Sequence, residues 1–314
     1  MNDELAWADA HLGEEPAVSD IFCLTFVKQV DVTEALRRMG GLFDTVAMRT
    51  AAEIEDLHTF DDGYPEVAAA LPLGDWTLVF EPNRFHGSHL VAAMSVGTEA
   101  VSVLRHDYAS PAFVYAVDGN VVTRFDPTFP GDRYGTDPDR LVPQMLEVGF
   151  TVEDKEDDDD FEMFENDTAR SLRLAERLTG ALPTFEALTG PLTSVHVERW
   201  FSQERKPPAT RPDQSGPVDA VEEVRRLANL LDLADTPGLE DALTATKPVH
   251  VSPESPLGQH VRAWRTESRR ASWSLNDHGG RGRITDDQRR RAHDFGWLAA
   301  ALGAALQSEL KSAG

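Results

Sequence analysis

The stretch AFVYAVDGNVVTRFDP, residues 112–127, decides the fold class of this 314-residue chain. Its two halves are short, rich in Val and Phe, and bounded by turn residues, which is typical of β-strands. Between them lie Asp118 and Gly119, and both residue types tolerate the positive φ angles of a tight hairpin turn. The stretch therefore predicts two antiparallel strands joined by a hairpin.

Segments on both sides of this hairpin extend the pattern. Further β-prone runs are found at residues 20–27, 42–48, 76–82, 99–107 and 192–200. Helical patterns are found at residues 31–41, 50–58, 137–149 and 167–180. In the first of these helices Asp31 can cap the start, and Gly40 can end it in the left-handed conformation. The whole predicts an α+β domain over residues 20–200, an antiparallel sheet with helices packed on one face.

The character of the chain changes after residue 200. Residues 201–217 are rich in Pro and polar residues and predict a linker. Helical spacing of apolar residues then recurs at 218–234, 255–273 and 285–306. Residues 218–314 are therefore expected to form a small all-helical domain. The polar, acidic residues 1–19 are expected to be a flexible N-terminus.

The net charge of −24 is confined to the first part of the chain. Residues 1–200 hold 14 Lys/Arg and 38 Asp/Glu, whereas the remainder holds 16 of each. Residues 153–167 alone carry ten acids and one lysine, which predicts a solvated loop. Such a surface disfavours nucleic acid and anionic lipid and suits a partner with a basic surface.

Several features predict a cytoplasmic protein without a membrane segment. Cys23 is the only cysteine, so no internal disulfide can form. The N-terminus lacks the basic start and apolar core of a signal peptide. The longest apolar run, residues 295–306, is too short to cross a bilayer.

Several blocks of the first domain resemble a known family. They are FCLTFVKQVDVTEALRRMGG at 22–41, GDWTLVFEPNRFHGS at 74–88, residues 113–150, and LAERLTGALPTFEALTGPL at 174–192. In this order they resemble a family of uncharacterised actinobacterial proteins that is defined only as a domain of unknown function. The resemblance covers roughly residues 20–200, implies a boundary near residue 200, and carries no activity or catalytic residues.

Histidines and aspartates near strand ends are weak catalytic candidates. His106 and Asp126 each end a predicted strand and could serve in general base catalysis if the chain is an enzyme. His86 and His89 could bind zinc only on one helical turn, but Gly87 and the preceding Glu-Pro predict a turn here. The sequence therefore predicts no metal site and no cofactor, and it contains no nucleophile or phosphate-loop motif.

The helical domain carries an arginine array. Arg262, Arg265 and Arg269 are spaced to share one helix face, and Trp264 in the same segment could stack against a ligand. One interpretation is an anion-binding surface. The other is a solvated helix face paired with the acidic first domain.

Three function classes follow. The first is a non-catalytic, cytosolic protein-binding module, an adaptor, regulator or immunity-type inhibitor, that uses its acidic surface. Its acidic loop includes Asp157, Asp158, Asp159 and Asp160. The second is an enzyme or binder of a phosphorylated or nucleotide ligand at the domain interface. The third is nucleic-acid binding through the Arg-rich helices, against which the overall charge argues.

Overall fold

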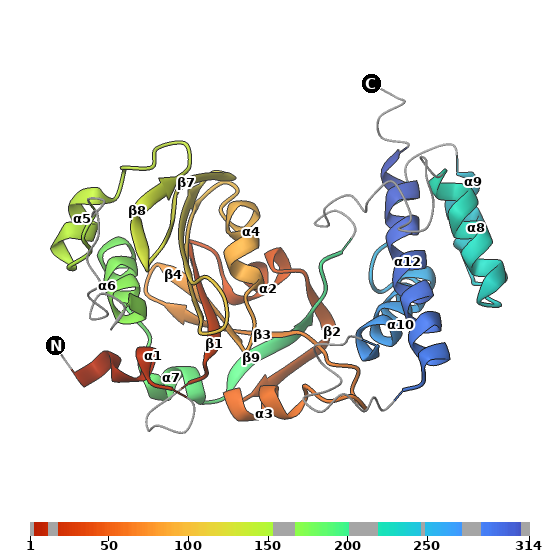
Figure 1. The fold of residues 1–314 in the computed structure, drawn as a ribbon, viewed down its shortest axis with the longest axis horizontal. Helices are drawn as coiled ribbons and strands as arrows, with labels where there is room; N and C mark the ends of the chain where they lie inside the picture. The colour runs from red at the N-terminus through yellow and green to blue at the C-terminus, as the bar shows by residue number, and fades with distance from the viewer. Residues whose placement is uncertain are drawn as a thin grey trace. The chain divides into compact units, whose positions relative to one another are not determined.

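A computed structural model describes residues 3–11, 18–152, 167–200, 219–245, 249–271 and 284–308 (Figure 1). Contacts within the chain divide it into two compact units. The sheet unit comprises Met1–Asp56 and Glu66–Glu198, and the helical unit comprises Leu57–Pro65 and Arg199–Gly314. The expected linker, residues 201–217, lies outside the described residues, as does the acidic segment except for Asp167.

The sheet unit is built on an antiparallel sheet that has nine strands among the described residues. In chain order the strands are β1 (Ile21–Lys28), β2 (Gly41–Arg49), β3 (Val67–Leu73), β4 (Trp76–Pro82), β5 (Glu99–His106), β6 (Ala112–Val117), β7 (Asn120–Asp126), β8 (Phe129–Tyr134) and β9 (Leu192–Val197). Their order across the sheet is β2-β9-β3-β4-β1-β5-β6-β7-β8. The α+β class and the antiparallel sheet are therefore confirmed.

The β6–β7 hairpin forms as the sequence predicts. Val117 pairs with Asn120, so Asp118 and Gly119 alone make the turn. Their φ angles are 45° and 79°, both positive. Two positive φ angles give the turn a twist that matches the right-handed twist of the strands. The turn residues thus set the pairing next to the turn, and the register shifts further along, between Tyr115 and Ala116.

Helices cover both faces of the sheet, not one face as expected. The sheet unit contains α1 (Ala6–Asp9), α2 (Val32–Arg38), α3 (Ala51–Asp56), α4 (His86–Met94), α5 (Val142–Glu147), α6 (Asp167–Thr179) and α7 (Phe185–Thr189), after a 3-10 turn, η1 (Asp3–Leu5). Gly87 of α4 lies against Cys23, whereas Trp7 of α1 lies against Phe22. Neighbouring residues of a strand point to opposite faces, so α4 and α1 cover different faces. Figure 1 shows α2 and α4 on one side and α5 and α6 on the other.

The N-terminal segment packs on the sheet, unlike the flexible N-terminus that the sequence predicts for residues 1–19. Trp7 is only 2% exposed, and its ring centroid lies 5.9 Å from that of Phe22. Asp9 accepts the backbone N–H groups of Thr168 and Ala169, each at 3.0 Å. These are the unsatisfied first amides of α6. A buried indole and a capping carboxylate therefore anchor the described part of this segment.

The helical unit contains α8 (Ala220–Leu230), α9 (Leu239–Thr244), α10 (Pro256–Arg270) and α12 (Asp286–Ser308). Its core includes Leu227, Val261 and Leu302, each essentially inaccessible to solvent. Helix α10 begins at a local side-chain cap. The Ser255 hydroxyl accepts the N–H of Gly258 at 3.0 Å, with Pro256 in the first turn. The predicted helices at 218–234 and 255–273 are confirmed with shorter bounds, and the one predicted at 285–306 is confirmed but ends two residues later.

Candidate functional site

Helix α4 forms where the sequence predicted a turn, and that prediction is wrong. The carboxylate of Glu81 accepts the backbone N–H groups of His86 at 3.1 Å and Gly87 at 2.7 Å. These are first-turn amides that have no partner within the helix, and a negative charge is favourable there. Glu81 therefore caps α4 from the end of β4. His86 and His89 consequently lie one helical turn apart.

A buried polar network lies beneath this helix. The Cys23 thiol is 3.2 Å from the Ser102 hydroxyl, which is also 3.2 Å from the Thr25 hydroxyl. A Cβ atom at Gly87 would lie 2.1 Å from Thr25 Oγ1 and 2.8 Å from Glu81 Oε2. Only glycine at this position lets the first turn of α4 approach the sheet so closely. These contacts thus determine how closely α4 approaches β1 and β5.

Cys23 is expected to be unreactive in the folded protein. Burial, and secondly the Glu81 charge, raise the pKa of its thiol to about 12, so the reactive thiolate is scarce at pH 8. The side chain is also inaccessible to solvent. We expect no alkylation by iodoacetamide at pH 8 without denaturant and complete alkylation in denaturant, measured as a mass shift. Rapid labelling of the native chain would contradict this placement.

A pocket of about 370 Å³ lies between α4 and strands β5 to β8. The helix end contributes Phe85, Ser88 and His89, and the 109–111 loop forms part of the wall. The sheet contributes Leu104, His106, Ala112, Arg124, Phe125, Asp126 and Tyr134. Leu104 pairs with Ala112 and Arg124 with Tyr134, so members of each pair share a face. Residues far apart in the sequence therefore converge below α4.

Phe85 is the centre of an aromatic cluster at this pocket. Its ring centroid lies 5.6 Å from that of His86, 5.9 Å from His89 and 5.8 Å from His106. Phe85 itself is 39% exposed, unlike most large apolar side chains of the unit. Sequence reasoning singled out the three histidines but not Phe85. An exposed ring among imidazoles is a surface on which a flat ligand can pack.

His106 and Asp126, the sequence-based catalytic candidates, line the same pocket. Asp126 Oδ1 accepts the N–H of Thr128 at 2.9 Å, and His106 Nδ1 accepts the N–H of Tyr108 at 3.3 Å. An accepting Nδ1 leaves the proton of a neutral imidazole on Nε2. No hydrogen bond or ion pair joins the His106 and Asp126 side chains, both of which are described. The structure therefore brings the two candidates together in one pocket without making them a dyad.

One cluster among the described residues has the composition of a metal site. Ligand atoms of His11, Asp20 and Asp107 lie within 4.8 Å of one another. The two carboxylates already have protein partners: Asp107 binds Arg105 through both oxygens, and Asp20 accepts the hydroxyl of Tyr108 at 3.0 Å. These contacts account for the cluster without an ion.

The α4 pocket lies in the part of the chain that a family model covers. Residues 2–191 match DUF6461, a family of unknown function. The chain belongs to this family. Every residue that lines the pocket falls within the match, whereas α8 to α12 of the helical unit follow it. No curated protein and no solved structure matches the chain. Of the helices in the described ranges, none combines the length and apolarity needed to cross a membrane.

Outside the DUF6461 domain, arginines of α10 bind backbone carbonyls within the helical unit. Arg269 Nε donates to the carbonyl of Gly63 at 3.2 Å. Arg265 donates to the carbonyl of Arg199 at 2.8 Å, and its guanidinium lies 5.1 Å from the ring centroid of Trp200. Guanidinium groups engaged in this way hold segments of the unit together.

The remaining members of the predicted arginine array lie on the same helix. Trp264 is 3% exposed and packs in the core, so its ring is not available for stacking on a ligand. Arg262 is partly buried on α10. Asp157, Asp158, Asp159 and Asp160 lie outside the described residues. The predicted role of these four aspartates in binding a partner stays a prediction.

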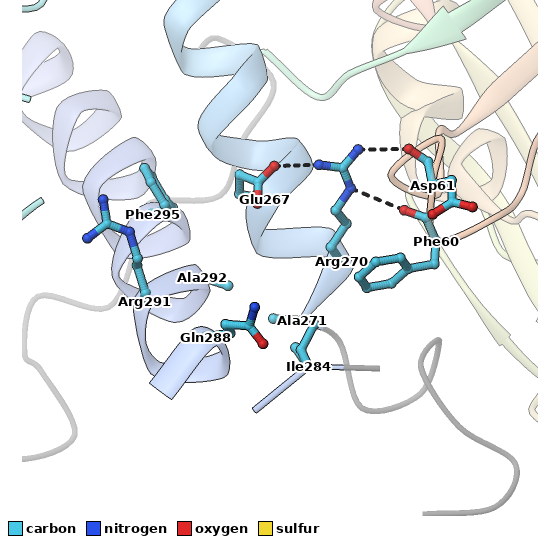
Figure 2. Close-up of a pocket in the computed structure, with 10 residues that line it drawn as sticks. All are labelled: Phe60, Asp61, Glu267, Arg270, Ala271, Ile284, Gln288, Arg291, Ala292 and Phe295. Carbon is cyan, nitrogen blue, oxygen red and sulfur yellow. Dashed lines mark hydrogen bonds and ion pairs between the residues drawn. The ribbon is translucent and has the colours of Figure 1, made fainter. Parts of the chain in front are cut away.

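A second pocket, of about 420 Å³, lies within the helical unit (Figure 2). Phe60 and Asp61 meet α10 and α12 there. Arg270 donates to both of their carbonyls and to Glu267, as the dashed lines in Figure 2 show. The guanidinium of Arg270 is therefore already engaged by protein groups. The α4 pocket remains the better candidate for a ligand.

Asp167, at the start of α6, is expected to make stability depend on pH. Burial raises its pKa to about 7 against the pull of Arg170, and the charges of Asp9 and Asp126 raise it further. A raised pKa means that the folded state holds this proton more tightly, so stability is lost as pH rises from about 4 through 7. Asp167→Asn removes this loss above pH 7.

The advantage of Asp167→Asn should therefore be larger at pH 8 than at pH 5. We expect a difference of about 1–2 kcal/mol, reduced from the full linkage value because the carboxyl is partly solvated. Urea unfolding at both pH values measures it. Asp75→Asn, in an exposed turn, controls for the lost charge. An equal advantage at both pH values would show that Asp167 titrates normally.

Proposed function

We propose that the DUF6461 domain is a cytoplasmic binding module that holds a small organic ligand in the α4 pocket. The observation that carries this proposal is the convergence of α4 and four strands on one concave site of about 370 Å³. This volume lies at the lower end of the range for small-molecule sites, roughly 300–1,000 Å³. Apolar walls with a few polar groups are the usual composition of such sites.

Binding is favoured over catalysis by the arrangement of the polar groups. A general base is normally oriented by a second group, such as a carboxylate that binds its imidazole. The described contact of His106 Nδ1 is the backbone N–H of Tyr108, and Asp126 is engaged by Thr128. The sequence suggested a phosphorylated or nucleotide ligand at the domain interface, whereas this proposal puts the ligand within the sheet unit.

Filling the pocket tests this function. His89 is exposed on α4 and lines the pocket, whereas Ala93, one turn further along, is exposed but does not line it. His89→Trp should abolish binding of aromatic fragments detected by saturation-transfer NMR, and the matched control Ala93→Trp should bind them as the natural chain does. Ala112→Phe, from the sheet side, should also block binding. Equal fragment binding by all four proteins would reject the pocket.

A second candidate function is supported by the charge distribution. We propose that the acidic surface, including Asp157 to Asp160, binds a protein partner with a basic surface, because the excess of acids lies in residues 1–200. Such binding weakens steeply with salt. Affinity capture eluted with a salt gradient should release one stoichiometric partner at moderate salt. Replacing Asp157, Asp158, Asp159 and Asp160 with Asn should lower the salt concentration needed for release. Binding that does not depend on salt would contradict the proposal.

A further inference from the structure

We infer that the ligand of the α4 pocket carries a carboxylate or phosphate group that Arg124 binds, and a ring that packs on Phe85. This inference rests on the proposed ligand-binding function and adds the chemical class of the ligand. Arg124 is the single Lys or Arg among the described residues that line the pocket. It lies on β7, directly opposite Tyr134 of β8.

Among the described residues, the guanidinium of Arg124 has no hydrogen-bond or ion-pair partner, unlike the guanidinium groups of Arg105 and Arg133. Arg124 is also exposed. Arg105 on β5 binds Asp107 through two nitrogens, each at 2.8 Å. Arg133 on β8 binds Asp139 and the carbonyl of Pro130. Arg124 thus retains its donors for a ligand.

The chemistry of arginine selects the ligand group. Its planar set of N–H donors matches the two oxygens of a carboxylate or phosphate, and such charge-assisted pairs are among the strongest hydrogen bonds. The sheet unit is strongly acidic, so its overall field repels anions. A preference of this pocket for an anion must therefore come from a local positive group.

Asp126 limits where the anion can lie. It is the acidic residue among the described lining residues, two positions from Arg124 on the same strand. Alternate residues of a strand share a face and are separated by about 6.6 Å. Asp126 Oδ1 is occupied by the Thr128 N–H. The anion is therefore expected on the side of Arg124 that faces Tyr134, with Asp126 facing the uncharged part of the ligand.

The ring of the ligand is expected between two exposed aromatic side chains. Phe85 is 39% exposed at the helix end of the pocket, and Tyr134 is 66% exposed on the edge strand. Both line the pocket. Aromatic rings pair favourably at centroid separations of about 4.5–7 Å. A ligand with a ring next to its anionic group can use Phe85 and Arg124 together.

Fluorinated probes separate the contributions of ring and charge. 4-Fluorophenylacetate, 4-fluorobenzylphosphonate and neutral 4-fluorophenethyl alcohol are titrated against the full chain by ¹⁹F NMR. We expect at least one anion to bind about tenfold more tightly than the alcohol, as one charge-assisted pair allows. The stronger anion distinguishes a carboxylate ligand from a phosphate ligand.

Two arginine variants assign the preference to its residue. Arg124→Gln should remove the tenfold preference and leave binding of the alcohol within twofold. Arg140→Gln makes the same change of charge at an exposed arginine that does not line the pocket, and it should change nothing. Circular dichroism checks that both variants fold.

The outcomes are distinguishable. Equal binding of all three probes, blocked by His89→Trp, would overturn the anion inference and leave the ligand-binding function standing. An equal loss of affinity in Arg124→Gln and Arg140→Gln would also overturn it, because the effect would then be one of net charge. If none of the probes binds, and aromatic fragments also fail to bind, the proposed function fails together with the inference.

Discussion

Glu81→Ala is expected to lower the free energy of unfolding by about 3–5 kcal/mol, the usual cost of removing one partner from a buried charged network. Glu81 is 1% exposed. Its two oxygens accept N–H groups from the first turn of α4, and His86 Nδ1 lies 3.5 Å from Oε1. Without the carboxylate, two buried amides lose their acceptor, and each such loss costs about 1–3 kcal/mol.

The same substitution should also disrupt the pocket, because α4 carries Ser88 and His89 into it. Urea unfolding measures the stability, and ¹⁹F titration of the probes measures the pocket. Glu81→Gln keeps one acceptor oxygen and should cost less than Glu81→Ala.

Glu66 provides a matched control on the other side of the same imidazole. Its carboxylate lies 3.3 Å from His86 Nε2, but its side chain is 30% exposed. Because water screens such a pair, Glu66→Gln should cost below about 1 kcal/mol. If Glu81→Ala cost no more than Glu66→Gln, the capping role of Glu81 would be excluded.

The origin of the α4 cap explains why sequence reasoning missed this helix. Asp31 and Ser255 precede their helices directly, so their caps can be read from neighbouring residues. The residue before α4 is Phe85, whose side chain makes no cap, and the acceptor is Glu81, four residues earlier on a strand. A local sequence pattern therefore does not reveal this tertiary contact.

Strand β3 was missed for a related reason. Its sequence, VAAALPL, is rich in alanine, which has a low strand propensity, and it contains Pro72. It forms because β4 and β9 supply ladder partners on both sides. Because the side chains of Ala68, Ala69 and Ala70 are small, they can be buried beneath the covering helices. Tertiary pairing thus overrides the local preference.

Only some residues of the candidate site were predictable from the sequence, and its geometry was not. His106 and Asp126 were identified because they end predicted strands, and both line the pocket. Their convergence depends on the β5–β8 registers and on the position of α4, neither of which a single sequence specifies. Arg124, like Phe85, gave no signal, since one arginine in a strand looks like any solvated residue.

Arg105→Ala is expected to release the N-terminal segment and to lower the free energy of unfolding by about 2–4 kcal/mol. Removal of the buried guanidinium leaves several acceptors unsatisfied. Arg105 is 4% exposed. Besides Asp107 it binds the carbonyls of Ala8 at 3.0 Å and Ala10 at 2.6 Å. Ala8 lies in the last turn of α1 and Ala10 directly follows the helix, so the guanidinium holds this segment on β5.

Limited proteolysis followed by mass spectrometry measures the release directly. In the natural chain, cleavage within residues 3–11 should be slow, because Trp7 packs against Phe22. In Arg105→Ala it should become fast while the rest of the sheet unit stays protected. Arg105→Lys keeps the charge but lacks the planar set of donors, so it should give an intermediate rate. If the variant unfolds throughout, or if its N-terminus stays protected from cleavage, Arg105 does not hold the N-terminal segment on β5.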